Sequence, residues 1–267
     1  MPTTPYKTRR SPERDMIFGL HAVLEAIDAG REIEKILIRR DAGGALSRQL
    51  IDRLKGLPVP VQRVPVEKLN QFTDKNHQGV IAFVAPISFQ PLDNLVPWLF
   101  EQGRVPLLVV LDGITDVRNL GAIARTCVCA GVDALIVPTV GNAAIKADAV
   151  KASAGALHKL AVCRTADMEQ CLHFLTASGI AAIAATEKAQ QLYTTCDLTQ
   201  PTAIVMGSEE FGIAPEHLQL CNSRIRIPMS GAIGSLNVSV SAGIIIYEAL
   251  RQRHLINPKL IQSQKNI

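Results

Sequence analysis

This sequence contains no long apolar stretch. None of its 267 residues lies in an uncharged apolar run of about 18 or more, the length that a membrane-spanning helix needs. The first 15 residues, MPTTPYKTRRSPERD, also lack the apolar core of a secretory signal. A hydrophobic content of 48% with 19% charged residues is typical of a folded globular protein. We therefore expect a cytoplasmic protein with no membrane partner.

Cysteine pairs of the kind that bind zinc are also missing. The six cysteines form no CxxC pair and have no histidines at zinc-site spacing. Cys127 and Cys129 are two residues apart on an expected helix, so they point to different faces and cannot easily share an ion. We expect reduced thiols, mostly buried as small apolar side chains, and no metal.

Two common nucleotide-binding loops are absent as well. No GxGxxG follows the first apolar strand of the second half, and the loop from Gly207 to Gly212 lacks the Lys-Ser/Thr pair that completes a P-loop. These absences exclude a dinucleotide-binding Rossmann site and a P-loop phosphate site.

Excess positive charge is confined to the front of the chain. Residues 1–86 carry 14 Lys and Arg against 10 Asp and Glu, whereas residues 87–267 carry 14 of each. The first 14 residues alone hold four Lys and Arg and one Glu. We predict a flexible basic arm at residues 1–15 that contacts phosphates. A solvated tail without a partner fits this composition equally well.

Residues 16–86 have the pattern of a small α/β module. Gly30 and Gly56 follow its two helical segments, where glycine favours a stop. His77 lies in the loop before the last strand and is more often an ordinary loop histidine than an RNA contact. The expected elements are helices at 20–29 and 45–54 and strands at 35–38, 59–64 and 80–84.

A linker is expected at residues 87–105. Prolines surround a short amphipathic segment that contains Trp98, the only tryptophan. We predict that this segment docks onto the second domain.

The strands of the second domain are apolar throughout. Its clearest runs are LLVVL at 107–111, ALIVP at 134–138, IAAIAA at 180–185 and TAIVM at 202–206. Strands that are apolar on both faces are typical of a parallel sheet with helices on each side. The predicted fold class is α/β with a mainly parallel sheet.

Two of these strands end in polar loops. One leads through Asp112 and Gly113 into a helix that begins at about Asn119, and the other leads into the loop that begins at Gly207. Ligands of α/β sheets bind at the carboxyl ends of strands. We therefore expect the two loops to form one cleft.

Three motifs, in the expected order, carry a resemblance to a known family. They are Asn119-Leu120-Gly121 with Arg125, Met206-Gly207-Ser208-Glu209 with Gly212, and Ile227-Pro228 with Ser235-Leu236-Asn237-Val238-Ser239. Residues 106 to about 254 resemble the SpoU (TrmH-like) branch of the SPOUT RNA 2′-O-ribose methyltransferases, most closely the 23S rRNA guanosine type. Residues 16–86 more weakly resemble the RNA substrate-binding domain that often precedes it.

The resemblance implies both the fold and the activity. It implies a SPOUT catalytic domain at 106–255 with a deep trefoil knot in the last third of the chain, and a tail at 256–267. It also implies a homodimer that methylates the ribose of a guanosine in 23S rRNA, with S-adenosylmethionine as cofactor. The fused front domain favours structured rRNA. A tRNA 2′-O-methyltransferase and a non-catalytic RNA-binding protein of ribosome assembly are the alternatives.

The resemblance also implies the residues of the site. The catalytic positions are Asn119, Arg125, Glu209, Ser235 and Asn237, and the cofactor-binding positions are Gly207, Ile227 and Leu236. Glycine lets the main chain approach the cofactor, while the two apolar side chains pack on adenine. The simpler alternative for Ile227 and Leu236 is a place in the core.

Arg125 is the residue that we expect to matter most. It lies four positions after Gly121 on the expected helix, so the two share a face and the glycine leaves room for RNA beside the guanidinium. A guanidinium is nearly always protonated, which favours a phosphate clamp over a general base. A surface arginine without a role is the alternative.

The remaining positions also have simpler interpretations. Asn119 sits where a helix N-cap would lie. Ser235 and Asn237 either lie beside the ribose or cap a final helix at about 238–251. Glu209 either orients Arg125 or Asn119, or is simply exposed to solvent.

The second motif departs from the family pattern. Glu210 and Phe211 follow Glu209, where many relatives carry a small glycine. This bulk bears on the shape of the loop and on the target nucleotide, and not on the class of cofactor.

Overall fold

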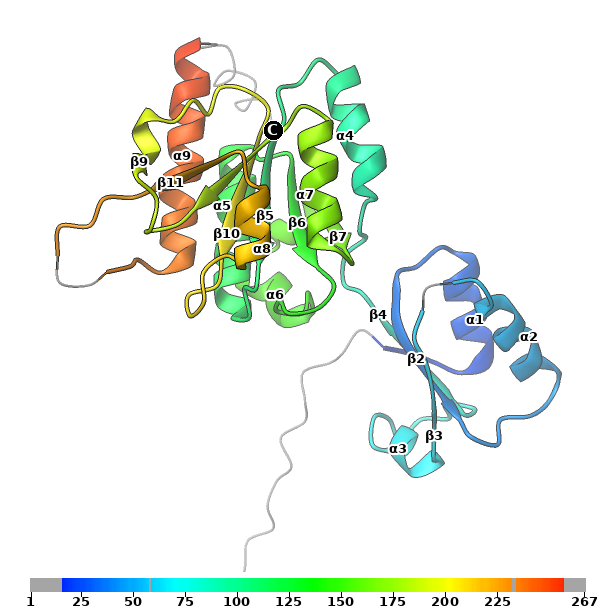
Figure 1. Ribbon diagram of the computed structural model, residues 1–267. Coiled ribbons are helices and arrows are strands. Elements are labelled where there is room, and N and C mark those ends of the chain that lie inside the picture. Colours follow the sequence, from blue (N-terminus) through cyan, green and yellow to red (C-terminus); the bar gives the residue numbers. More distant parts are fainter. Residues whose placement is uncertain (1–15, 58, 232–233, 257–267) are drawn as a thin grey trace, which may run out of the picture. The chain divides into compact units, whose positions relative to one another are not determined.

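The computed structural model describes residues 16–57, 59–231 and 234–256. The predicted basic arm at 1–15 and all but the first residue of the tail at 256–267 lie outside the described residues. The chain divides into two compact units, residues 1–88 and 89–267. Each unit has its own sheet and its own apolar core (Figure 1).

The front unit is built on a mixed four-stranded sheet. Its order is β1-β4-β2-β3, with β4 antiparallel to β1 and β2, and β3 parallel to β2. The expected helices and strands are confirmed, whereas β1 and α3 were not expected because they are too short to show a periodic pattern. The elements are β1 (Met16–Phe18), α1 (Leu20–Asp28), β2 (Ile33–Arg39), α2 (Ala45–Leu54), β3 (Val61–Val64), α3 (Val66–Asn70) and β4 (Val80–Val84).

Alternating side chains of the front sheet fill two small cores. Ile36 and Val80 face α1 and α2, while Leu37 and Ile81 face the opposite side, where Leu69 of α3 covers them. Because both faces are buried, β4 is apolar at every position.

The rear unit confirms the predicted parallel sheet. Its order is β7-β6-β5-β10-β8-β11-β9, and every strand pair in its described part is parallel. The elements are α4 (Leu92–Glu101), β5 (Leu107–Asp112), α5 (Val117–Ala130), β6 (Ala134–Pro138), α6 (Ala147–Ala152), β7 (Ala161–Thr165), α7 (Met168–Ala177), β8 (Ala181–Ala185), β9 (Gln191–Leu192), β10 (Thr202–Gly207), α8 (Pro215–Leu220), β11 (Ser223–Arg226) and α9 (Val238–Ile256). The trefoil knot stays a prediction.

Helices cover both faces of this sheet, with α4 and α7 on one side and α5 and α9 on the other (Figure 1). The segment around Trp98, expected to dock from a linker, is α4. Its side chains Leu95, Val96 and Leu99 are buried in the same core as Leu172 of α7. Trp98 itself is half exposed.

The last helix, α9, is anchored at its far end by Arg253. The guanidinium donates hydrogen bonds to four backbone carbonyls, those of Val105, Pro106, Leu198 and Gln200. These carbonyls precede β5 and β10, so one side chain ties α9 to the amino ends of the two central strands. Burial lowers the pKa of this guanidinium below its ordinary value.

The carboxyl ends of β5 and β10 are the place where the two polar loops meet. From β5 the chain moves outward through β6 and β7, and it then returns to β8 and β10 on the other side. Gly207, at the end of β10, lies opposite Asp112, at the end of β5. This reversal of strand order makes a crevice in open α/β sheets.

Most of the thiols are buried, as expected. Cys127, Cys163, Cys171 and Cys196 are buried, whereas Cys129 is exposed on the opposite side of α5. Burial raises the pKa of Cys163 to about 11 and that of Cys171 to about 12. These thiols therefore stay protonated at neutral pH.

The described part of the chain holds no group of three or more His, Cys, Asp or Glu side chains placed to bind a metal ion. Among its helices, none combines the length and the apolar character that crossing a membrane requires.

Candidate active site

Helix α5 begins with a capping carboxylate at Asp116. Its Oδ1 accepts a hydrogen bond from the backbone N–H of Arg118 at 2.8 Å, and the Arg118 guanidinium binds both carboxylate oxygens. These bonds hold the pKa of Asp116 below its ordinary value. Asn119 lies inside the first turn of α5, so its expected place at the N-cap was wrong. Its side chain is therefore available for another contact.

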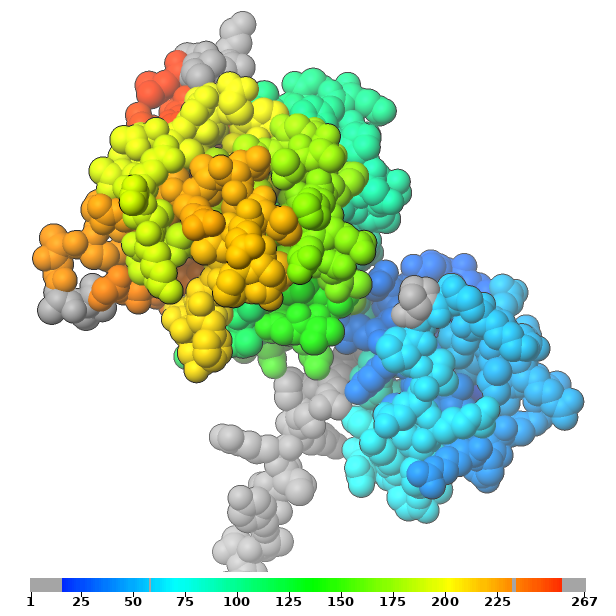
Figure 2. Space-filling view, in the orientation of Figure 1, coloured from blue at the N-terminus to red at the C-terminus, as the bar shows by residue number. Residues whose placement is uncertain are grey.

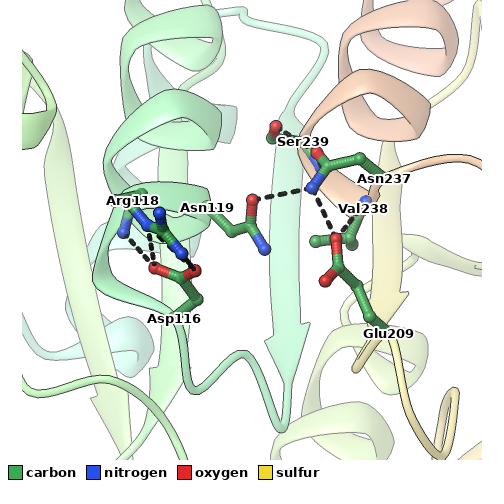
Figure 3. A network of polar contacts seen from close by, with 7 residues as sticks. All are labelled: Asp116, Arg118, Asn119, Glu209, Asn237, Val238 and Ser239. Carbon is green, nitrogen blue, oxygen red and sulfur yellow. Dashed lines mark hydrogen bonds and ion pairs between the residues drawn. The ribbon is translucent and has the colours of Figure 1, made fainter.

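Asn119, Asn237 and Glu209 form one polar network (Figure 3). The Asn237 amide nitrogen donates to Asn119 Oδ1 at 3.0 Å and to Glu209 Oε1. The backbone N–H of Val238 donates to the same carboxylate oxygen at 3.1 Å. Three segments that are far apart in the sequence thus meet at the crevice between β5 and β10.

Asn237 also caps α9. Its Oδ1 accepts from the backbone N–H of Ser239 at 2.9 Å and from the Ser239 hydroxyl. The expected cap is confirmed, whereas the bonds of Asn237 to Asn119 and Glu209 were not expected. The N-terminus of a helix carries a partial positive charge, which stabilises the carboxylate of Glu209 beside it.

The network leaves one donor and one acceptor open. Asn237 must present its amide nitrogen to Asn119, because its oxygen already accepts from Ser239, and Asn119 must therefore present its own oxygen. Asn119 Nδ2 and Glu209 Oε2 make no hydrogen bond within the described residues. Both atoms border the space between α5 and the Glu209 loop (Figure 3). This arrangement suits a ligand hydroxyl, which both donates and accepts.

A cavity of about 420 Å³, the first cavity, opens beside this network. The three predicted cofactor residues, Gly207, Ile227 and Leu236, all line it, and neither apolar side chain is plain core. Ser235 lines it too and makes no hydrogen bond to Asn119, Glu209 or Asn237. A capping role is not observed for Ser235, and its expected place beside the ribose stays a prediction.

The lining of the first cavity suits S-adenosylmethionine. Apolar side chains, among them Ile213 and Ile225, offer surfaces for an adenine ring. Glu187 and Glu209 place carboxylates at the cavity, which complement the positive sulfonium and ammonium groups of that molecule. The residues present therefore fit the cofactor.

The loop that follows β10 leaves no room for a side chain at Gly207. A Cβ at this position would lie 2.1 Å from the backbone carbon of Gly212 and 2.2 Å from the backbone nitrogen of Ile213. The glycine therefore has a packing role of its own, and the expected approach of the main chain to the cofactor stays a prediction. The end of β10 is packed directly against the returning chain.

Gly121 likewise has a structural role. A Cβ there would lie 2.6 Å from the Cβ of Ala152 and 2.7 Å from its backbone carbon. The glycine therefore lets α5 pack closely on α6, and the expectation that it leaves room for RNA was wrong.

Arg125 lies apart from the network. It is exposed on α5, lines neither this cavity nor the one described below, and makes no hydrogen bond or ion pair within the described residues. Glu209 reaches Asn119 through Asn237 and makes no contact with Arg125. The chain by itself therefore assembles Asn119, Glu209 and Asn237 without Arg125.

The loop from Ser208 to Ile213 is held at several points. Ser208 and Gly212 exchange two backbone hydrogen bonds of 3.0 Å. Beyond the loop, Asp112 Oδ2 accepts from the backbone N–H of Ala214 at 2.9 Å and lies 2.8 Å from His217 Nδ1. The pairing of Asp112 with His217 was not expected, since a separation of 105 residues leaves no local sequence signal.

A second cavity, of about 470 Å³, lies on the other side of this loop. Its lining includes Asp112, Thr115, Asp116, Asn119 and Gly141. Residues 208–212 line both cavities, so this loop is the wall between them.

His77 of the front unit is a structural residue. Its Nδ1 accepts from the backbone N–H of Gly79 at 3.0 Å, which leaves Nε2 to donate to Asn70 Oδ1 at 2.8 Å. Its side chain is buried. The interpretation as an ordinary histidine is supported, because neither ring nitrogen is free for RNA.

Both units match known protein families. Residues 106–247 match the SpoU rRNA Methylase family, and residues 16–90 match the family described as RNA 2′-O ribose methyltransferase substrate binding. A protein of Staphylococcus saprophyticus, named for the TrmH family of tRNA/rRNA methyltransferases, is 34% identical over 92% of this chain and 99% of its own length. YacO of Bacillus subtilis, named for the same family, is 31% identical over 91% and 98%.

Solved structures of methyltransferases resemble most of the chain. The SpoU methyltransferase AviRb from Streptomyces viridochromogenes, in complex with the cofactor AdoMet, has a TM-score of 0.57 at 25% identity and covers 89% of this chain and 90% of its own. An AdoMet-bound rRNA methyltransferase from Sinorhizobium meliloti has a TM-score of 0.58 at 25% identity, with coverages of 88% and 86%. A TrmH/SpoU tRNA modifying enzyme of A. aeolicus, 30% identical with a TM-score of 0.53, covers only 62% of this chain and 85% of its own.

Proposed function

Because the chain belongs to the SpoU rRNA Methylase family, and is thus an S-adenosylmethionine-dependent RNA methyltransferase, we propose that its substrate is a ribose 2′-hydroxyl of 23S rRNA, at a guanosine. The observation that carries the choice of rRNA is the front unit. The rRNA methyltransferase of S. meliloti covers 88% of this chain, whereas the tRNA modifying enzyme of A. aeolicus covers 62%. The excess of basic residues in 1–86 supports RNA binding by the front unit.

The open atoms of the network suit the transfer step. Bound in the first cavity, the cofactor supplies a methyl group on a sulfonium. Asn119 Nδ2 donates to the ribose 2′-oxygen and orients it, while Glu209 Oε2 accepts the proton of the 2′-hydroxyl. Val238 and Asn237 hold the carboxylate in place through Oε1.

Arg125 is assigned to the RNA backbone. Its exposed guanidinium on α5 fits a phosphate clamp, and its separation from the network supports a homodimer in which it completes the partner's site.

The substrate test uses purified protein with radiolabelled S-adenosylmethionine and either 23S rRNA or bulk tRNA. We expect label in 23S rRNA and none in tRNA, and mapping of 2′-O-methyl groups identifies the nucleotide. Glu209→Gln should lose transfer, while the exposed control Glu216→Gln should behave as wild type in transfer and in cofactor affinity. Label in tRNA alone would overturn the rRNA assignment. Cofactor binding without transfer to any RNA would favour the non-catalytic alternative.

The dimer test mixes two inactive proteins. Arg125→Ala leaves Glu209 intact, and Glu209→Gln leaves Arg125 intact, so a mixed dimer holds one complete site if Arg125 acts across the interface. After co-refolding we expect about one quarter of wild-type activity, because half of the dimers are mixed and each has one working site. No recovery, in a sample whose mass is that of a dimer, would place Arg125 in the site of its own chain.

A further inference from the structure

Phe211 is the most exposed aromatic side chain in the described part of the chain. It is a large apolar residue, yet 80% of its surface is open to solvent. Figure 2 shows the loop between β10 and α8 as a projection, in yellow to orange, from the surface of the rear unit. Phe211 lies within this loop and lines both cavities. An exposed aromatic at the wall between two cavities favours a binding role over a packing role.

The backbone below this ring is fixed. The N–H of Phe211 donates to the Ser208 hydroxyl at 3.0 Å, inside the turn that Ser208 and Gly212 close with their two backbone bonds. Glu209 is bound to the start of α9, and Ala214 is bound to Asp112. The loop therefore presents the ring without having to become ordered first, which lowers the entropic cost of binding.

The second cavity is acidic, and only part of that charge is matched. Both oxygens of Asp116 bind Arg118, and Asp112 Oδ2 is bonded to His217 and a backbone N–H. Glu210, next to Phe211, makes no ion pair or hydrogen bond within the described residues. Such a cavity repels phosphate and suits a flat ligand with N–H donors on its edge.

We propose that the second cavity holds the nucleobase of the nucleotide to be methylated, stacked on Phe211, with the Glu210 carboxylate accepting from its Watson–Crick edge. This inference rests on the proposed function. The base is joined directly to the ribose, and Asn119 and Glu209, which are assigned to the ribose, line the same cavity. RNA-binding proteins read unstacked bases by aromatic stacking and by hydrogen bonds to the base edge.

Guanine fits this pair of residues better than the other bases. Its N1–H and N2–H are two adjacent donors, which the two oxygens of one carboxylate accept together. Adenine, cytosine and uracil do not present two neighbouring donors on that edge. Inosine keeps N1–H and lacks the amino group, so it separates the two bonds.

The stacking test compares Phe211→Leu, Phe211→Tyr and the control Trp98→Leu, which alters a half-exposed aromatic that lines neither cavity. The RNA is a 23S rRNA transcript that contains the mapped nucleotide. We expect Phe211→Leu to raise KM for RNA about tenfold with the Kd for S-adenosylmethionine unchanged, since the variant loses one base–aromatic stack. Phe211→Tyr should stay within twofold of wild type because it keeps the stack, and Trp98→Leu should do so because Trp98 lies outside both cavities.

The edge test places guanosine or inosine at the target position. Wild type should prefer guanosine about tenfold in kcat/KM, and Glu210→Gln should lose most of that preference. An unchanged KM in Phe211→Leu, or an unchanged preference in Glu210→Gln, would overturn the proposal. A raised Kd for S-adenosylmethionine in Phe211→Leu would place the ring on the cofactor and also overturn it. If methyl enters tRNA instead, the rRNA assignment fails separately, and the same variants on that RNA decide the base site.

Discussion

The two units of this protein treat their polar loop residues differently. In the front unit, both ring nitrogens of His77 are bonded to Asn70 and Gly79, so the histidine only supports the fold. In the rear unit, Asn119 and Glu209 are each held by one atom while another atom stays open. The comparison teaches that the side chains suited to chemistry are those that the fold holds by one polar atom while another polar atom keeps its hydrogen-bonding capacity.

The sheets explain why the open positions occur in the rear unit. Neighbouring antiparallel strands, as in most of the front sheet, place their carboxyl ends at opposite edges. All pairs in the described rear sheet are parallel, so the loops after β5 and β10 emerge side by side. Only that arrangement brings Asp112 next to Gly207 and places two cavities around one loop.

The strongest way to break the rear site is Gly207→Val. The added side chain would overlap the backbone of Gly212 and Ile213, so the wall between the cavities must move. We expect loss of S-adenosylmethionine binding by calorimetry and a fall in methyl transfer of at least about 100-fold. Gly43→Val in the front unit is the control, because its new Cβ meets nothing closer than 3.9 Å. Normal cofactor binding in Gly207→Val would contradict the rigid wall described here.

Separating the units tests whether binding and chemistry divide as proposed. Residues 89–267 include α4, whose Leu95, Val96 and Leu99 belong to the rear core, so this fragment should fold and bind S-adenosylmethionine normally. Its kcat/KM for rRNA should fall by about tenfold or more, and its salt dependence should weaken by roughly 0.7 to 0.9 in log–log slope for each lost phosphate contact. A fragment that starts at residue 106 lacks α4 and should unfold. Equal RNA affinity and equal slope for fragment and full chain would show that the front unit does not bind RNA.

Asn237→Asp sharpens the comparison by separating a cap from a network contact. Aspartate still accepts from Ser239, but it cannot donate to Asn119 and it repels Glu209. We expect the melting temperature to change little while kcat falls about tenfold. Asp167→Ala, which removes the cap of α7, is the opposite control and should cost about 1 kcal/mol of stability with kcat unchanged. If both variants lost only stability, Asn237 would be a cap and nothing more.

Much of this arrangement could be predicted from the sequence, and the reasons for the rest are physical. Apolar runs identified β5, β6, β8 and β10 because they are buried on both faces, and the glycine-rich motifs identified the first cavity. Short elements such as β1, α3 and β9 carry too few residues for a period. Their positions depend on contacts made elsewhere in the chain.

Long-range contacts were the other missing information. The sequence indicated that Gly121 and Gly207 matter. It could not indicate that atoms of Ala152 and Gly212 leave no room for a Cβ at these two positions. Nor could it indicate that Asp116 would take the N-cap expected at Asn119. Spacing along a helix placed Arg125 near the site, and the folded chain leaves it outside both cavities.

The smallest kinetic effect is expected in the front unit. His77→Ala leaves Asn70 and the Gly79 N–H without their partner, which should cost roughly 1 to 3 kcal/mol of unfolding free energy. Affinity for S-adenosylmethionine and kcat at saturating RNA should stay within twofold of wild type, since the residue supports only the front fold. Urea unfolding measures the loss of stability, and steady-state kinetics at saturating RNA measures kcat. A large fall in kcat with unchanged stability would give His77 a direct part in the reaction.

Helix α9 determines when, during synthesis of the chain, the active site can form. Its first residues, Asn237 and Val238, complete the network, and Arg253 near its other end ties it to the chain before β5 and β10. During translation, the strands and the loop that begins at Ser208 leave the ribosome before this helix exists. A nascent chain therefore holds Asn119 and Glu209 with nothing to join them. The catalytic network closes only when α9 docks, so the active site forms after every strand of the rear sheet has been made.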